Sequence, residues 1–110
     1  MSRHGTFAED TNDPIKIIGS LDLLAESVHS SLLKNRLFFK TVTLTVRFED
    51  FSTYKRSKTI SIWTLDIFVI KRTALQLLSK FIGNRKLRLV GIRITKLCER
   101  DEKQTLITDF

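Results

Sequence analysis

Residues 40–49 alternate between apolar and polar side chains without a break, with Val42, Leu44, Val46 and Phe48 on the apolar parity. This period of two predicts a β-strand with one buried face. After Asp50-Phe51-Ser52, residues 53–62 carry Thr, Lys, Ser, Thr and Ser at their odd positions. We therefore expect two antiparallel strands with hydroxyls and cations on a shared outer face. That face suits phosphate oxygens, and an ordinary solvated sheet surface is the alternative.

Two other segments repeat apolar residues every three or four positions, as amphipathic helices do. The first starts at Asp13-Pro14, an N-cap followed by a proline at the first helical position, and ends near Asn35. The second starts at Asp66 and is expected to stop at Gly83-Asn84. The predicted buried stripes are Ile17, Leu21, Leu24, Val28 and Leu32 for the first helix, and Ile67, Ile70, Ala74, Leu77, Leu78 and Phe81 for the second.

The remaining segments complete a β-α-β-β-α-β order. Residues 3–8 predict a first strand with Phe7 toward the core, and residues 86–97 a last strand with Val90, Ile92 and Ile94 on one side. Trp63 is interpreted as part of a loop. This order predicts an α+β fold, a four-stranded β-sheet with two helices packed on one face and the other face open. We expect one domain over residues 1–97 and a flexible tail over residues 98–110.

Charge is concentrated in the middle of this 110-residue chain, whose formal net charge is +7. Between Lys34 and Lys96 there are fifteen basic and three acidic residues. Such a surface predicts a polyanionic partner, either nucleic acid or an anionic membrane. Cys98 is the only cysteine, which favours a reducing, cytoplasmic location, and no apolar run reaches transmembrane length.

Little in the sequence supports catalysis. A glycine-rich phosphate loop, a Cys/His metal spacing and a serine elbow near a histidine are all missing from the sequence. The acidic clusters at residues 9–13 and 99–102 could in principle hold Mg²⁺, but such clusters at element ends are usually caps and solvated turns. His29 is interpreted as structural. We therefore expect no catalytic, metal or cofactor site in this chain.

The open sheet face invites comparison with RNA-recognition modules, which stack bases on aromatic residues of their central strands. Here the outward positions are threonine and arginine, and Phe48 has the core parity. Contact with a duplex backbone through hydroxyls and guanidinium groups therefore fits better than base stacking.

Four motifs occur in an order that resembles a known family. They are Ser2-Arg-His-Gly-Thr-Phe7-Ala-Glu-Asp-Thr11, Lys40-Thr-Val-Thr-Leu-Thr-Val-Arg-Phe48, Thr53-Tyr-Lys-Arg-Ser-Lys-Thr59 and Leu89-Val-Gly-Ile-Arg93. Over residues 2–97 the chain resembles the little finger domain of Y-family translesion DNA polymerases of the DinB or polymerase IV group, in an archaeal form. The resemblance implies the same fold and an open face that grips the template and primer backbones in the major groove.

The resemblance also implies which residues contact DNA. On the first strand either Arg3 or His4 is expected to face the duplex, since the parity there is ambiguous, and Leu89 stands where some relatives place an arginine. The complete implied set is Arg3, His4, Thr6, Thr41, Thr43, Thr45, Arg47, Lys55, Arg56, Ser57, Lys58, Arg88 and Arg93.

The same resemblance implies partners outside the chain. The palm carboxylates that would bind catalytic Mg²⁺ are absent, so the chain is expected to act with the palm, fingers and thumb of a longer polymerase. Gln104, Ile107 and Phe110 fit a sliding-clamp-binding pattern, Gln-x-x-aliphatic-x-x-aromatic. The alternative is a stand-alone basic adaptor that docks on a protein, for which no salt-dependent binding to duplex DNA is expected.

Overall fold

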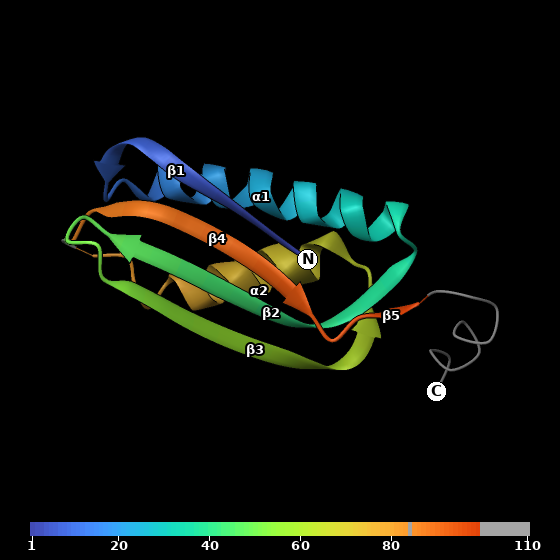
Figure 1. Cartoon of the computed structure of the whole chain (residues 1–110). Coiled ribbons are helices and arrows are strands. Elements are labelled where there is room, and N and C mark those ends of the chain that lie inside the picture. Colours follow the sequence, from blue (N-terminus) through green and yellow to red (C-terminus); the bar gives the residue numbers. More distant parts are fainter. Residues whose placement is uncertain (84, 100–110) are drawn as a thin grey trace.

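The computed structural model describes residues 1–83 and 85–99. Its order of four main strands and two helices confirms the predicted α+β fold, and one short strand is added at the end (Figure 1). The elements are β1 (Ser2–Thr11), α1 (Pro14–Lys34), β2 (Leu37–Phe48), β3 (Thr53–Thr64), α2 (Ile67–Leu78), β4 (Leu87–Thr95) and β5 (Cys98–Glu99).

The main strands lie in the order β1-β4-β2-β3, and every pair is antiparallel. β5 pairs with the start of β2, where Leu37 lies opposite Glu99 and Phe38 opposite Cys98. Lys96 has a left-handed φ of 54° at the turn between β4 and β5. The sheet therefore continues two residues past the boundary at residue 97, into the segment predicted as a tail.

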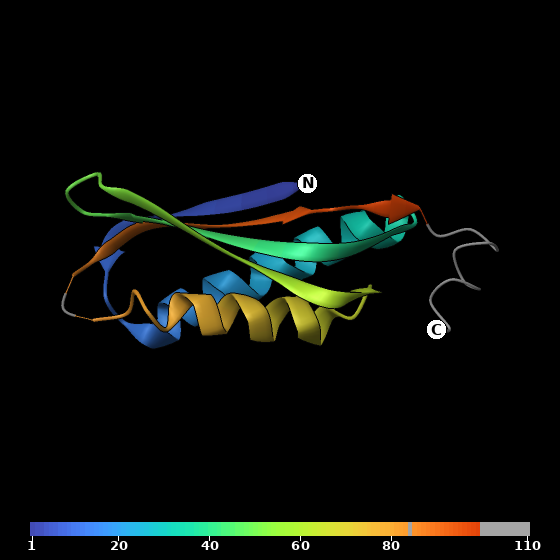
Figure 2. The same ribbon diagram turned by 90° about the horizontal axis from the view of Figure 1, so that it is seen from below.

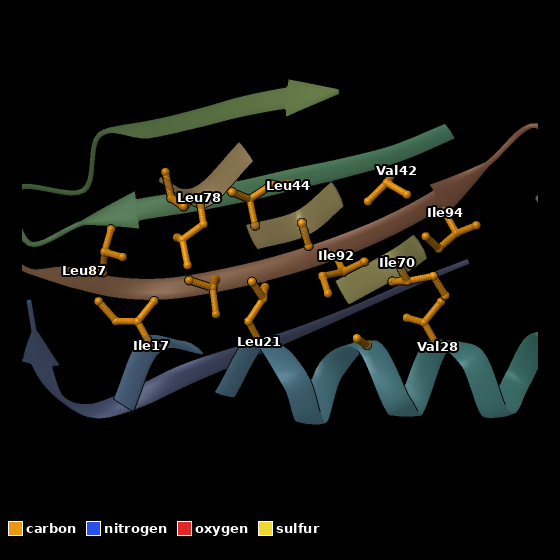
Figure 3. Close-up of a cluster of buried hydrophobic side chains, with 14 of the residues drawn as sticks. Ile17, Leu21, Val28, Val42, Leu44, Ile70, Leu78, Leu87, Ile92 and Ile94 are labelled. Atoms are coloured by element: carbon orange, nitrogen blue, oxygen red, sulfur yellow. The ribbon is translucent and has the colours of Figure 1, made fainter. Parts of the chain in front are cut away.

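Both helices cover the same side of the sheet, and the other side is left uncovered by them (Figure 2). Figure 3 shows the core between the two layers, where Leu21 of α1 and Ile70 and Leu78 of α2 meet Leu44 and Ile92 of the sheet. Burying these apolar side chains removes them from water and supplies the main driving force for the fold. The predicted buried stripes are confirmed for Ile17, Leu21, Val28, Leu32, Ile70, Ala74 and Leu78, which are at most 2% exposed.

Both helix starts lie where the sequence predicts them. The Asp13 carboxylate accepts a hydrogen bond from the Ile15 N–H at 3.0 Å, and the Asp66 carboxylate accepts one from the Phe68 N–H at 2.9 Å. These contacts satisfy N–H groups that have no partner within the helix. Asn35 forms the C-cap of α1, as predicted.

Several predicted boundaries are wrong, and β1 runs to Thr11 rather than ending at residue 8. α2 ends at Leu78 rather than near Gly83, because the chain tightens and the Phe81 N–H donates to the Leu78 carbonyl at 2.8 Å. Trp63 belongs to β3 rather than to a loop, since β2 starts early enough for Phe39 to lie opposite Thr64. Both strands of the hairpin are therefore longer than their alternating pattern indicated.

The turn between β2 and β3 is held by polar contacts. The Asp50 carboxylate accepts hydrogen bonds from the Ser52 N–H at 3.0 Å and the Ser52 hydroxyl at 2.6 Å. It also forms an ion pair with Arg85 at 2.9 Å. The Ser52 hydrogen bonds, followed by the charge of Arg85, lower the pKa of the Asp50 carboxyl. Phe51 closes the turn with a left-handed φ of 68°.

Gly19 offers a test of the helix assignment. A Cβ at this position in α1 would meet no atom within 4 Å, so Gly19→Ala adds no clash and removes the backbone-entropy penalty of glycine. We expect the free energy of unfolding to rise by about 0.5–1 kcal/mol in urea titrations. Gly91→Ala is the matched control: its Cβ would approach the His4 Cβ to 3.2 Å, so no comparable gain is expected. Equal gains at both positions would contradict this packing.

Candidate nucleic-acid interface

The side of the sheet away from the helices, here called the open face, collects hydroxyls and cations. Residues opposite each other on neighbouring strands share a face, so the register assigns each side chain to one side. Thr45 of β2, for example, lies opposite Gly91 of β4 and Lys55 of β3. The open face consists of Ser2, His4, Thr6, Thr41, Thr43, Thr45, Arg47, Thr53, Lys55, Ser57, Thr59, Leu89, Gly91, Arg93 and Thr95.

Hydroxyl pairs cross from β2 to β3 along this face. Thr41 and Thr59 share a hydrogen bond of 2.9 Å between their Oγ1 atoms, and Thr43 Oγ1 and Ser57 Oγ are 2.7 Å apart. Arg47 Nε donates to Thr53 Oγ1 at 3.0 Å. That bond uses one of the five guanidinium N–H donors and orients the group, so the other donors are available to an anion.

A shallow depression of about 540 Å³ lies in the middle of the open face. Gly91 is buried in its floor, where an added Cβ would meet the His4 Cβ at 3.2 Å and the Thr45 Cβ at 3.7 Å. Around it lie the side chains of His4, Arg47, Lys55 and Arg93. The open face as defined above holds the cations Arg47, Lys55 and Arg93 and no carboxylate, so its electrostatic potential favours anions.

The structure resolves the parity of β1. His4 lies opposite Gly91 and Thr6 opposite Leu89, so both are on the open face. Arg3 lies opposite Ile92 and turns toward α1, where its guanidinium donates to Ser27 Oγ at 3.1 Å and Ser31 Oγ at 2.7 Å. The side chain of Arg3 thus ties β1 to α1. The parity of Phe7, which packs against the core, could have predicted this, because Arg3 and Phe7 are four residues apart.

Two predicted contacts on β3 lie on the opposite side. Arg56 is paired with Leu44 and Lys58 with Val42, and both partners point into the core. Lys58 Nζ donates to the Gln76 side chain of α2 at 3.2 Å. Alternation along β3 separates these cations from Lys55 and Ser57, which do lie on the open face. The expected grouping of all four on one surface is therefore wrong.

Arg88 is engaged elsewhere in the fold. The register of β4 shifts between Leu87 and Leu89, and the Arg88 guanidinium forms an ion pair with Asp10 at 3.6 Å. It also lies 4.4 Å from the ring centre of Phe51. Arg88 therefore joins the end of β1 to the hairpin turn, and the structure does not group it with the depression.

The other candidates from the sequence have different outcomes. His29 Nε2 lies 2.8 Å from the Leu65 carbonyl and joins α1 to the segment before α2, in agreement with a structural role. Gln104, Ile107 and Phe110 lie outside the described residues. Within residues 1–83 and 85–99, no group of three His, Cys, Asp or Glu side chains could hold a metal ion. No helix in the same part of the chain is long and apolar enough to cross a membrane.

Comparison with known proteins identifies the family. Residues 1–107 match the impB/mucB/samB family C-terminal domain. The chain belongs to this family. It is 74% identical over 110 residues to DNA polymerase IV 2 of Methanosarcina mazei and 37% identical to DNA polymerase IV of Methanoculleus marisnigri. All of this chain is covered in both comparisons, and it spans 30% and 31% of those relatives.

Solved structures share the fold at lower sequence identity. A little finger domain of PolIV, in complex with a beta-clamp processivity factor, superposes with a TM-score of 0.72 at 22% identity, covering 92% of this chain and 91% of that one. The Dbh ternary complex gives a TM-score of 0.77 at 18% identity, covering 90% of this chain and 29% of that one. The chain thus has the little finger fold, and it spans about 30% of the curated polymerase relatives that it matches.

Unfolding measurements distinguish the roles of Arg3 and His4, the two neighbouring candidates on β1. Arg3→Ala removes hydrogen bonds between β1 and α1 and should lower the free energy of unfolding by about 0.5–1.5 kcal/mol. His4→Ala is the control, since no hydrogen bond of the described residues involves its exposed side chain, and it should unfold at the same urea concentration as the parent protein. Equal destabilisation by both changes would argue against the tether.

Proposed function

We propose that this chain is the DNA-gripping little finger of a DNA polymerase IV-type translesion polymerase. The observation that carries the proposal is the open face, whose cations and hydroxyls surround a depression without a carboxylate. Family membership and the names of the relatives support it. The proposed contacts are the open-face members of the predicted set: His4, Thr6, Thr41, Thr43, Thr45, Arg47, Lys55, Ser57 and Arg93.

The proposed contacts hold the duplex by its sugar-phosphate backbone in the major groove. Arg47, Lys55 and Arg93 neutralise phosphates, and the threonine and serine hydroxyls donate to phosphate oxygens. The open face carries no phenylalanine, tyrosine or tryptophan to stack on bases and no asparagine or glutamine to read adenine edges. With its arginines engaged on phosphates, binding is independent of sequence, as a polymerase that moves along its template requires.

The domain acts together with the rest of a longer polymerase. In this proposal the chain contributes duplex affinity during lesion bypass, and the palm of the parent protein supplies the nucleotidyl transfer with its Mg²⁺ ions. The domain would work in the cytoplasm, on nucleoid DNA.

A sliding clamp is the second proposed partner. The sequence of Gln104, Ile107 and Phe110 keeps the spacing of a clamp-binding peptide, and the PolIV little finger of similar fold was solved with a beta-clamp. The two apolar side chains would enter an apolar pocket of the clamp, with Gln104 hydrogen-bonding beside them.

The salt dependence of DNA binding tests the proposed duplex contacts. For two unrelated duplexes measured by fluorescence anisotropy, log Kd should depend equally on log salt. Arg47→Gln or Arg93→Gln should each reduce the magnitude of this slope by about 0.9, because one phosphate is no longer neutralised. Lys16→Gln on α1 is the matched control and should leave the slope unchanged. A flat salt response, or loss of binding to one duplex only, would contradict backbone gripping and would favour the adaptor alternative.

The clamp contact is tested separately by calorimetry with a purified archaeal sliding clamp. Ile107→Ala together with Phe110→Ala should reduce the affinity at least about tenfold, since two apolar anchors are removed from their pocket. Thr105→Ala and Thr108→Ala lie at the unrestricted positions of the pattern and serve as the control. Equal affinity of both double variants would exclude this peptide as the clamp contact.

A further inference from the structure

β3 carries a second basic surface on its other side. It is an edge strand, and its even-numbered side chains point to the helix side of the sheet. α2 covers this side incompletely, because Tyr54 is 45% exposed and Arg56 and Lys58 are exposed as well. These residues form a flank between β3 and α2 that is separated from the open face by the sheet itself.

α2 and the turn after it border the same flank. Lys58 Nζ donates to the Gln76 side chain, which places this side of α2 next to β3. Lys80 lies in the turn after Leu78 and lines a pocket together with Tyr54. The basic flank is defined here as Arg56, Lys58 and Lys80. None of these three takes part in the ion pairs found among the described residues, which join Lys71 to Glu26, Arg85 to Asp50 and Arg88 to Asp10.

An aromatic pocket lies at one end of the basic flank. Its volume is about 320 Å³, and its walls include Phe48, Tyr54, Phe81, Lys80 and Arg85. The Tyr54 and Phe81 ring centres are 6.0 Å apart at 33°, and Tyr54 meets the edge of Phe48 at 5.7 Å and 72°. Gly83 also lines the pocket, and a side chain there would meet no atom within 4 Å. The pocket is thus open to solvent beside an exposed tyrosine.

An aromatic pocket continuous with unpaired cations matches single-stranded DNA. Proteins bind single strands by stacking unpaired bases on aromatic rings while cations follow the phosphates. Duplex DNA cannot use the rings, because its bases are already stacked and paired. The pocket volume is at the lower end of the range for small ligands, which suits one base.

We propose that the basic flank and the aromatic pocket bind a single-stranded DNA segment, with one base in contact with Tyr54 and its phosphates along Lys80, Arg56 and Lys58. This site lies beyond the proposed duplex contacts, and it uses residues of β3 that alternate with them. Edge strand β3 therefore serves a duplex with its odd-numbered side chains and a single strand with its even-numbered ones.

Binding of a fluorescein-labelled 12-nucleotide oligo-dT to the whole chain tests the cationic part. Lys58→Gln with Lys80→Gln should weaken binding and reduce the magnitude of the log–log salt slope by about 0.7 per lysine. Lys16→Gln with Lys34→Gln removes the same charge from α1 and is the matched control, expected to leave the slope unchanged. Equal weakening by both double variants, or no change in either, would overturn the proposal.

The duplex measurements distinguish the two proposals. Arg47→Gln with Arg93→Gln should retain oligo-dT binding while losing duplex affinity, and the flank variant should show the opposite pattern. Loss of both ligands in both variants would overturn a separate single-strand site. Failure of the parent protein to bind duplex, with oligo-dT binding that depends on the flank, would overturn only the duplex proposal.

Cross-linking tests the aromatic part. Oligo-dT containing one 5-iododeoxyuridine should form a photo-adduct that mass spectrometry locates at Tyr54 or Phe81. Tyr54→Leu keeps an apolar side chain against Phe48 and should weaken oligo-dT binding about fivefold or more, the loss of one stacked base. Phe68→Leu changes an aromatic residue that is 71% exposed at the start of α2 and should have no effect. An adduct on the open face, or equal affinities of both variants, would overturn the pocket assignment.

Discussion

The alternation of side chains along β2 is the constraint on which the rest of the structure depends. β2 pairs with both β3 and β4, so its pleat fixes the facing of three strands. Val42 and Leu44 are fully buried under the helices, while Thr43 and Arg47 point to the opposite side. A slip of one residue would expose the core and bury an arginine at once, which is doubly unfavourable. The core and the cationic surface therefore stabilise the same register.

The cations of this domain divide into two groups by their partners. Lys71, Arg85 and Arg88 form ion pairs that join elements, and Arg85 and Arg88 also lie over the rings of Phe48 and Phe51. Asp50 and Asp10 are thus used in fixing the hairpin turn and the end of β1. The open face and the basic flank keep their charge without a carboxylate, so their positive potential is directed outward to a polyanion.

The sequence was sufficient for the architecture because its signals are local. Period-two alternation, two stripes of period near 3.6 and two aspartate caps predict the element order and the side on which the helices pack. The sequence was insufficient for those turns and strand ends whose conformation depends on pairing with distant parts of the chain. Three turns have a left-handed backbone at residues other than glycine, namely Arg36, Phe51 and Lys96. Because such residues rarely adopt this conformation, their residue types did not predict these turns. β5 exists only because the start of β2 is available to pair with it.

The members of the candidate interface were predictable only where the alternation of side chains between the two faces of the sheet was used to assign them. On β2 the pattern places Thr41 to Arg47 correctly, because a long alternating run leaves one arrangement. On β3 the alternation of side chains places Lys55 and Lys58 on opposite faces of the sheet. The family resemblance, in contrast, implied both residues as contacts of one DNA-binding surface. The aromatic pocket could not be predicted, since Phe81 reaches Tyr54 only through the chain reversal after α2.

The pairing of β5 with Leu37 and Phe38 places Glu99, the last residue that the structure describes, at the start of β2. Glu99 therefore lies about ten residues along that strand from Arg47, a distance of roughly 30 Å at the rise of a β-strand. A partner that binds the chain beyond Glu99 would therefore be attached far from the depression around Gly91 on the open face. Such an attachment would limit the movement of the domain and would leave its cationic surface free to bind.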